Sequence, residues 1–237
     1  MFTTALGDQF FPNAAPVDFD VIDDVVIGYE IVPIDGVSNQ LGIAQPTNFE
    51  FNGAEEYRTI AAGMRLDLAD FEDNRNNNAD DDSVLVAIHE MGHALGVGPA
   101  WQLVCGVACR ANGVFDYTCP RASSEYRALN LAAGTTEVLI ENDTGGVRDC
   151  GHWEDASFPE SNGFSEVMSA VLQSGVDQLL TTVSAGAIDD LGGYGTIDFT
   201  GADDPNNRND EDPPLKPKRS FVLGTNSAGV TTITYLD

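Results

Sequence analysis

The sequence predicts an α+β protein, with strands in its first part and helices further along the chain. Two segments before residue 70 have the composition of strands, and two later segments repeat their apolar residues at helical spacing. With 237 residues, 42% of them hydrophobic, the chain is long enough for one domain with a substantial core. We therefore expect a twisted N-terminal sheet, a helix packed behind it, and a more irregular second lobe.

The strand predictions come from residues 24–32 and 62–68. Residues 24–32 are rich in β-branched and aromatic side chains. In residues 62–68, methionine and leucine alternate with small or polar neighbours, as in a half-buried strand. The polar run that follows, residues 70–82, is dominated by Asp and Asn and predicts a surface loop. It ends in Asp82 and Ser83, which are good helix N-caps.

The first predicted helix covers residues 83–95. Its apolar residues recur at helical spacing, and Gly96 and Gly98 followed by Pro99 end it. The apolar positions are Val84, Leu85, Ile88, Met91 and Leu95.

Turn-forming residues dominate residues 99–151, which predict an irregular insertion. A second helix is predicted for residues 181–192, with Thr182 or Ser184 as its cap. Its apolar face consists of Val183, Ala187, Ile188 and Leu191.

Three parts are expected along the chain. Residues 1–98 form an N-terminal lobe with the sheet and the first helix, and residues 99–200 form a C-terminal lobe. Residues 201–237 begin with an acidic, Pro-rich linker, and their last part, from residue 220, can form a short hairpin.

The charge of the chain argues against two classes of partner. It has 38 Asp and Glu residues against 11 Lys and Arg residues, a formal net charge of -27. Such a surface repels the phosphates of nucleic acids and anionic lipid headgroups. No apolar stretch has the length of a membrane-spanning helix. We therefore expect neither a nucleic-acid partner nor a membrane-spanning segment.

The cysteines favour an exported protein. Their spacing fits no paired C-x-x-C zinc ribbon, so two disulfides, in one of three connectivities, are favoured over free buried thiols. The cysteines are Cys105, Cys109, Cys119 and Cys150. The first eight residues lack the basic and apolar regions of a signal peptide, so a secreted or cell-surface protein would have its export signal elsewhere or already removed.

The first helix carries an H-E-x-x-H motif, running from His89 through Glu90 to His93. The i, i+4 spacing places both imidazoles on one face of a helix, where they can bind one metal ion. Glu90 lies close enough to act as the general base for an attacking water.

A catalytic zinc ion needs a third protein ligand. In the compact motif H-E-x-x-H-x-x-G-x-x-H, Gly96 is in place but Pro99 occupies the position of the third histidine. The chain has one further histidine, His152, so a third histidine ligand would have to be this residue. A glutamate ligand is the alternative, with Glu125 as the candidate.

Together these motifs resemble the leishmanolysin family of metzincin zinc peptidases. In that family an insertion separates the third histidine from the helix, Trp follows this histidine, and a later Glu-Leu-Met segment supplies a methionine turn beneath the metal. The matching segments here are His89–Gly96, His152–Glu154 and Ser165–Met168. The resemblance covers about residues 20–195, with Val167 where the family commonly has Leu.

The resemblance implies a two-lobed metzincin-like fold and a zinc-dependent endopeptidase that acts on protein or peptide substrates. It implies that His89, His93 and His152 bind one Zn²⁺, that Glu90 is the general base, and that Met168 is the Met-turn residue. Two alternatives remain: a non-catalytic secreted adhesion or surface module that retains a zinc site, and a gluzincin-type peptidase with Glu125 as the third ligand.

Overall fold

The structure, a computed structural model, describes most of the chain between residues 25 and 203 and two short segments near the C-terminus. The chain divides into two compact units, residues 1–207 and residues 208–237. The described residues are 25–37, 39–53, 56–76, 80–107, 115–131, 137–141, 150–158, 163–171, 176–200, 202–203, 220–225 and 231–236.

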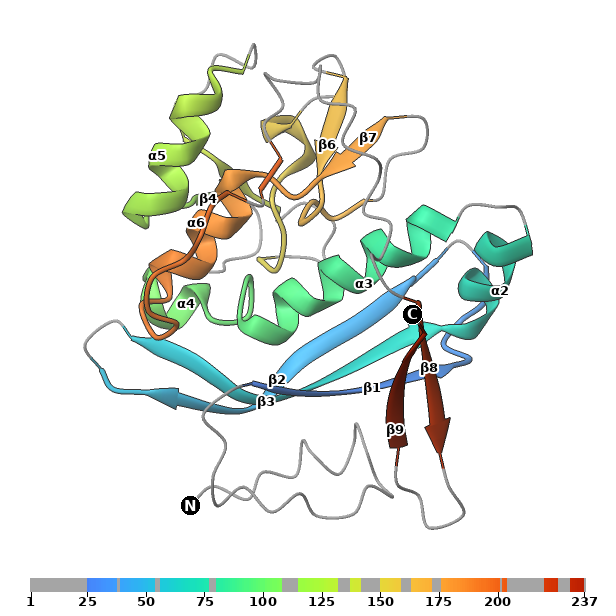
Figure 1. The fold of residues 1–237 in the computed structure, drawn as a ribbon. Coiled ribbons are helices and arrows are strands. Elements are labelled where there is room, and N and C mark those ends of the chain that lie inside the picture. Colours follow the sequence, from blue (N-terminus) through green and yellow to red (C-terminus); the bar gives the residue numbers. More distant parts are fainter. Residues whose placement is uncertain are drawn as a thin grey trace. The chain divides into compact units, whose positions relative to one another are not determined.

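A three-stranded sheet forms the first part of the larger unit (Figure 1). Its central strand, β3, pairs in parallel with β1 and antiparallel with β2, so β1 and β2 are the edge strands. The strands are β1 (Val26–Val32), β2 (Gly42–Phe51) and β3 (Tyr57–Asp67).

Both predicted strands are confirmed, as β1 and as the second half of β3, except that Leu68 belongs to the helix that follows β3; Asp24 lies outside the described residues. The sequence pattern did not predict β2. This strand contains Pro46, and its register shifts between Pro46 and Asn48 and again beyond Asn48. Proline and bulges are tolerated at a sheet edge but interrupt the alternation by which strands are recognised.

The Asp- and Asn-rich run is mostly helical, so the prediction of a surface loop over residues 70–82 is wrong. The helices are α2 (Leu68–Asn76) and α3 (Asp80–Leu95), and residues 77–79 lie outside the described residues. The Asp67 carboxylate starts α2 because it accepts a hydrogen bond from the amide of Ala69 at 2.7 Å, as an N-cap does. Asp70, in the first turn of α2, is buried rather than solvated.

Asp67 also fixes the segment between β1 and β2. Its other carboxylate oxygen accepts hydrogen bonds from the amides of Asp35 at 2.8 Å and of Ile34 and Gly36 at 3.1 Å each. These bonds, that of Asp35 foremost, lower the pKa of Asp67, because amide donors stabilise the ionised carboxylate. One side chain thus connects the end of β3, the start of α2 and the segment that leads into β2.

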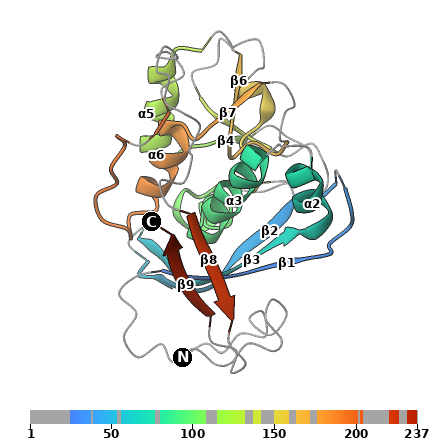
Figure 2. The same ribbon diagram turned by 45° about the vertical axis from the view of Figure 1, so that its right-hand side comes forward.

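The helix predicted for residues 83–95 is confirmed as α3, but it begins earlier, at Asp80, so Asp82 and Ser83 lie within the helix and do not cap it. It lies between the sheet and the remainder of the larger unit (Figures 1 and 2). Val86 and Ala94 form one hydrophobic cluster with residues of the sheet. Leu85 and Ile88 pack against the second, larger core. The helix is therefore covered on two sides.

The predicted apolar face of α3 is wrong at two positions. Val84 and Met91 are 37% and 44% exposed, whereas Glu90 and His93 are buried. Polar side chains thus take buried positions of α3 while two large apolar ones face solvent. Burying ionisable groups costs free energy unless they are paired or hydrogen-bonded.

Beyond α3 the larger unit is built from short elements. They are α4 (Trp101–Val104), β4 (Phe115–Asp116), α5 (Pro120–Leu129), β5 (Leu139–Ile140), the 3₁₀ helix η1 (Asp155–Ser157), β6 (Phe164–Glu166), β7 (Asp177–Leu179) and α6 (Thr182–Asp190). β4 pairs with β5, and β6 pairs with β7.

The segment predicted to be irregular, residues 99–151, contains the ten-residue helix α5. Its own N-cap residue makes no side-chain cap, and Asp190 at the end of α6 accepts hydrogen bonds from the amides of Arg121 and Ala122 at 2.8 and 2.9 Å. This cap comes from another helix, so the local sequence supplies a proline in the first turn of α5, Pro120, but no side-chain cap.

The second predicted helix is confirmed as α6, with a corrected cap. Thr181, rather than Thr182 or Ser184, accepts the capping hydrogen bond, from the amide of Val183 at 3.2 Å. The apolar face is as predicted: Val183, Ala187 and Leu191 are buried, and Ile188 is partly buried.

An aromatic cluster fills the core beside α6. The ring of Trp153 stacks on Trp101 with centroids 4.4 Å apart, and Tyr117 packs edge-on against both. The Trp153 indole N–H donates to the Ser184 hydroxyl at 2.9 Å. The residue that follows His152 is thereby anchored in the core.

Cys105 and Cys119 form a disulfide between the end of α4 and the start of α5. Among the described residues no cysteine is free, so the prediction that the cysteines pair is confirmed for this bridge. Cys109 lies outside the described residues.

The smaller unit contains one antiparallel pair, β8 (Ser220–Thr225) and β9 (Thr231–Leu236), as the predicted hairpin requires. Most of the predicted linker, residues 201–219, lies outside the described residues, and the division of the larger unit at residue 98 stays a prediction. Within the described part of the chain, no helix combines the length and apolar character needed to cross a bilayer.

Candidate metal centre

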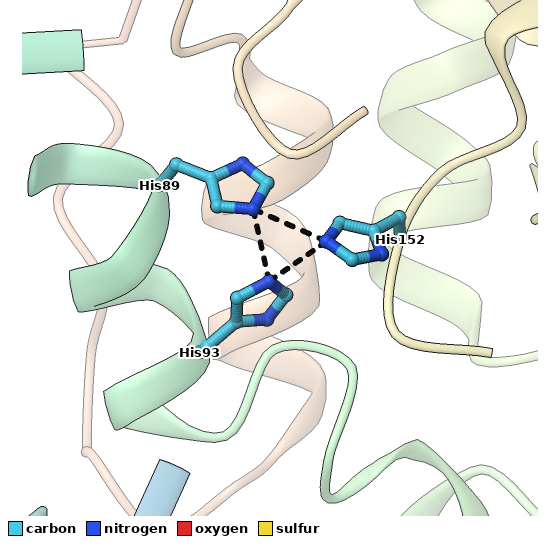
Figure 3. Close-up of side chains that lie close together, drawn as sticks. All are labelled: His89, His93 and His152. Carbon is cyan, nitrogen blue, oxygen red and sulfur yellow. Dashed lines mark hydrogen bonds between the residues drawn. The ribbon is translucent and has the colours of Figure 1, made fainter. Parts of the chain in front are cut away.

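Three imidazoles converge beside α3 (Figure 3). The Nε2 atoms of His89 and His93 lie 3.0 Å apart, and the Nε2 atom of His152 is 3.1 Å from the first and 3.0 Å from the second. Among the described residues, these three histidines form the group that can hold a metal ion. The structure therefore brings together all three predicted ligands.

Glu125, the alternative third ligand, is placed elsewhere. It lies on α5, where its carboxylate forms an ion pair with Arg121 at 3.0 Å, one helical turn away. It is not part of the histidine group.

The two helix histidines are oriented by backbone carbonyls. His89 Nδ1 is 2.7 Å from the carbonyl oxygen of Val167, and His93 Nδ1 is 2.9 Å from that of Val97. A carbonyl only accepts, so each imidazole must carry its proton on Nδ1, which leaves the Nε2 lone pair facing the centre. Hydrogen bonds of this kind fix the orientation of metal-binding histidines.

Burial keeps these imidazoles neutral. It lowers the pKa of His89 to about 4, with a further lowering by His152, and it holds the pKa of His93 well below its ordinary value.

Three lone pairs at this separation repel one another unless a cation lies among them. Nitrogen ligands of a tetrahedral zinc ion are about 3.3 Å apart, given Zn–N distances of about 2.0–2.1 Å, so the triangle fits such an ion. The same donor set also suits other transition metals.

His152 reaches the helix through a close backbone contact between two glycines. Gly98 has φ +87°, and a Cβ atom there would lie 2.3 Å from the carbonyl oxygen of Gly151. The backbone of His152 is also fixed on both sides, since its carbonyl accepts from the amide of Glu141 at 3.0 Å and the next amide, of Trp153, donates to the carbonyl of Met168 at 3.0 Å. The third ligand is therefore positioned by backbone contacts.

Met168 packs against the helix between the two ligand-bearing turns. Its side chain is buried, and a Cβ atom at Gly92 would lie 2.5 Å from its sulfur. A glycine inside a helix costs about 1 kcal/mol relative to alanine, and here its lack of a side chain makes room for the methionine.

Glu90 faces the same cavity as the histidines. It is 4% exposed, and its Oε2 atom is buried without a hydrogen-bond partner. Burial raises its pKa to about 8. On the sheet side Gly42 lies against the carboxyl group, since a Cβ atom there would be 2.7 Å from Oε1. A buried carboxylate oxygen without a donor indicates a position where a water or a cation belongs.

The cavity around these groups has a volume of about 940 Å³. The start of β2 forms one wall, α3 another, and residues 167–171 a third, with the three histidines and Glu90 between them. Among the described residues that line the cavity there is no Lys or Arg, and the carboxylates are those of Asp35 and Glu90. Pockets of this size bind drug-sized molecules.

Several residues that shape the site were not predicted. Gly42 and Gly151 act through the absence of a side chain, and the carbonyls of Val97 and Val167 act through backbone atoms that every residue has. Sequence patterns carry no signal for such roles. For Gly98, the pattern indicated only the end of a helix.

No protein-family model matches the chain, and no curated protein sequence matches it. Membership of the leishmanolysin-like family therefore stays a prediction. The class that the fold and site define is an α+β protein with a three-histidine group able to bind a metal ion.

Proposed function

We propose that the protein is a secreted zinc-dependent endopeptidase with a metzincin-like, leishmanolysin-like site. The observation that carries the proposal is the orphaned carboxylate oxygen of Glu90, which faces the same cavity as the three converging histidines. A purely structural metal site does not need an unpaired buried carboxylate beside it, because such a group is costly to bury.

Each residue of the proposed active site has a distinct role. His89, His93 and His152 hold the ion, and the two carbonyl contacts keep the helix imidazoles in the tautomer that binds. Zinc, when bound, supplies positive charge that polarises the scissile carbonyl and acidifies a water molecule. A cation bound by the histidines would favour the ionised form of Glu90, which could then accept a proton from the attacking water and return it to the leaving amine.

The edge strand β2 supports a peptide substrate. Its first residues line the cavity, and β3 pairs with one side of β2, so the other side offers backbone groups to an extended chain. Gly42 begins this strand and lies against Glu90, so a peptide that binds there would run past the proposed base.

A secreted location is supported by the disulfide, which persists in oxidising compartments. The acidic composition suits a protein that must stay soluble outside a cell.

The test compares Glu90→Gln, His152→Ala and Glu125→Gln with the wild type, each loaded with zinc. Wild type and Glu125→Gln should bind one zinc ion per chain and hydrolyse casein or a quenched peptide library. Glu90→Gln should keep the zinc but lose about 10²–10⁴-fold in kcat/KM, the usual contribution of a general base. His152→Ala should lose both zinc and activity.

Three results would contradict the proposal. Equal hydrolysis by the wild type and by Glu90→Gln would remove Glu90 from the mechanism. Unchanged zinc stoichiometry in His152→Ala, with loss of zinc in Glu125→Gln, would instead support the gluzincin-type alternative. A wild type that binds zinc but cleaves no peptide in the library would favour the adhesion module.

A further inference from the structure

One peptide group, that between Val167 and Met168, is bound at both of its ends. Its carbonyl oxygen is the 2.7 Å acceptor for His89 Nδ1, and its N–H donates to Glu166 Oε2 at 2.5 Å. The peptide bonds of the described chain are trans, so the C=O and N–H of this group point in opposite directions. Glu166 and His89 therefore lie at opposite edges of a single peptide group and are connected through it.

Glu166 is an unusual residue to find in this place. It is fully buried, and none of the ion pairs found in the described part of the chain involves it. Its partners are neutral donors: the Met168 amide, the Thr181 amide at 3.2 Å, the Thr181 hydroxyl at 3.3 Å and the Ser184 hydroxyl. Burying a carboxylate among neutral donors is costly, so its retention calls for a role.

A second path leads from Glu166 to another ligand. The Ser184 hydroxyl that contacts Glu166 accepts a hydrogen bond from the indole N–H of Trp153 at 2.9 Å. Trp153 directly follows His152, and its amide donates to the carbonyl of Met168. The supports of two of the three ligands thus meet at one buried carboxyl group.

We propose that Glu166 is a positioning residue of the metal centre, acting on His89 through the Val167–Met168 peptide. Its carboxylate polarises the peptide, which makes the Val167 carbonyl a stronger acceptor for the Nδ1 proton of His89. This holds the imidazole in the tautomer and orientation that present Nε2 to the ion. Polarisation along hydrogen-bond chains strengthens each bond by about 10–30%. The inference rests on the metal site of the proposed function and does not require peptidase activity.

The experiment uses zinc affinity and one NMR signal. Glu166→Gln keeps the shape of the side chain but removes its charge. It also replaces one of the two acceptor oxygens that face the donors by an NH₂ group. Ser165→Ala is the matched control, because it removes a neighbouring buried hydroxyl that has no hydrogen-bond partner. Zinc affinity is measured by competition with a chromogenic chelator, and the Nδ1 proton of His89 by ¹H–¹⁵N NMR of the zinc-loaded protein.

We expect Glu166→Gln to bind zinc about 10–100-fold more weakly than the wild type, the usual effect of removing a group that supports a metal ligand. The His89 Nδ1 proton should move upfield as its hydrogen bond weakens, and Ser165→Ala should match the wild type in both readouts. In the wild type the Met168 amide proton should lie well downfield, a measurement that remains available if Glu166→Gln does not fold.

The inference is overturned if Glu166→Gln matches the wild type in zinc affinity and in the His89 signal, or if Ser165→Ala weakens zinc binding equally. A Met168 amide proton at an ordinary chemical shift would also overturn it. Failure of the wild type to bind zinc would be a different result, because it would refute the proposed function itself.

Discussion

The contact between Gly98 and Gly151 gives a quantitative prediction for Gly98→Ala. The Cβ atom would lie 2.3 Å from the Gly151 carbonyl oxygen and 2.9 Å from its carbonyl carbon and Cα, and all three are backbone atoms that cannot rotate away. Restoring ordinary van der Waals contact requires the two segments to separate by about 1 Å. His152 follows Gly151 directly, so the third ligand should move with it.

Two costs add in this variant. Alanine at φ +87° costs about 1–2 kcal/mol, and forcing the backbones apart costs about 1–3 kcal/mol more. The metal-free protein should therefore lose about 2–5 kcal/mol in its free energy of unfolding. Metal affinity should fall at least about tenfold, because ligand distances in metal sites hold to within about 0.2 Å.

The matched control is Gly195→Ala. Gly195 has φ +72°, but nothing lies within 4 Å of the Cβ position, so only the backbone strain of about 1–2 kcal/mol is expected. Both variants are measured by urea unfolding of the metal-free protein and by zinc competition with a chelator. Equal losses of stability in the two variants, with wild-type zinc affinity in Gly98→Ala, would refute the reasoning.

Three further predictions concern the surroundings of the site. Gly42→Ala should lower kcat/KM while the protein still binds one zinc ion per chain. The new Cβ would lie 2.7 Å from Oε1 of Glu90 and would displace this proposed base. An unchanged kcat/KM would contradict the prediction, because it would show that Glu90 tolerates this displacement. Asp67→Asn should be less stable than the wild type. Amide hydrogen bonds, that of Asp35 foremost, lower the pKa of Asp67 in the folded state, so the difference in stability should be present above pH 3.8 and should disappear as the pH falls through this lowered pKa. Urea unfolding over a pH series checks the sign, and a difference that grows toward acid pH would contradict it. Replacing both Cys105 and Cys119 by serine should lower the free energy of unfolding by about 3 kcal/mol, the loop-closure estimate for a sequence separation of 14. An unchanged unfolding midpoint would contradict this prediction.

The metal centre was predictable where it depends on side chains. The spacing of His89 and His93 on one helix determines their common face, and the small number of histidines pointed to His152. The general base was predictable for the same reason, because Glu90 lies within the motif. The carbonyl contacts that orient the imidazoles could not be predicted, since they depend on where distant backbone segments pass.

The fold was predictable where the pattern is local. Residues 24–32 have the composition of a strand, residues 83–95 have the periodicity of a helix, and both segments form the expected elements. The start of α2 depends on Asp67, which was assigned to a strand. The start of α5 is capped by Asp190, which lies 69 and 68 residues beyond the two amides that it binds. Capping across such distances leaves no trace in a local window.

The close contact between Gly98 and Gly151 has a consequence for how this protein can change over time. The two glycines bring the ends of a segment of about fifty residues together, so the position of His152 is set at the closure and does not depend on the length of chain between. Surface parts of that segment that do not enter the aromatic core can gain or lose residues while the three histidines stay in place. New recognition surfaces can therefore arise there without disturbing the metal-binding geometry.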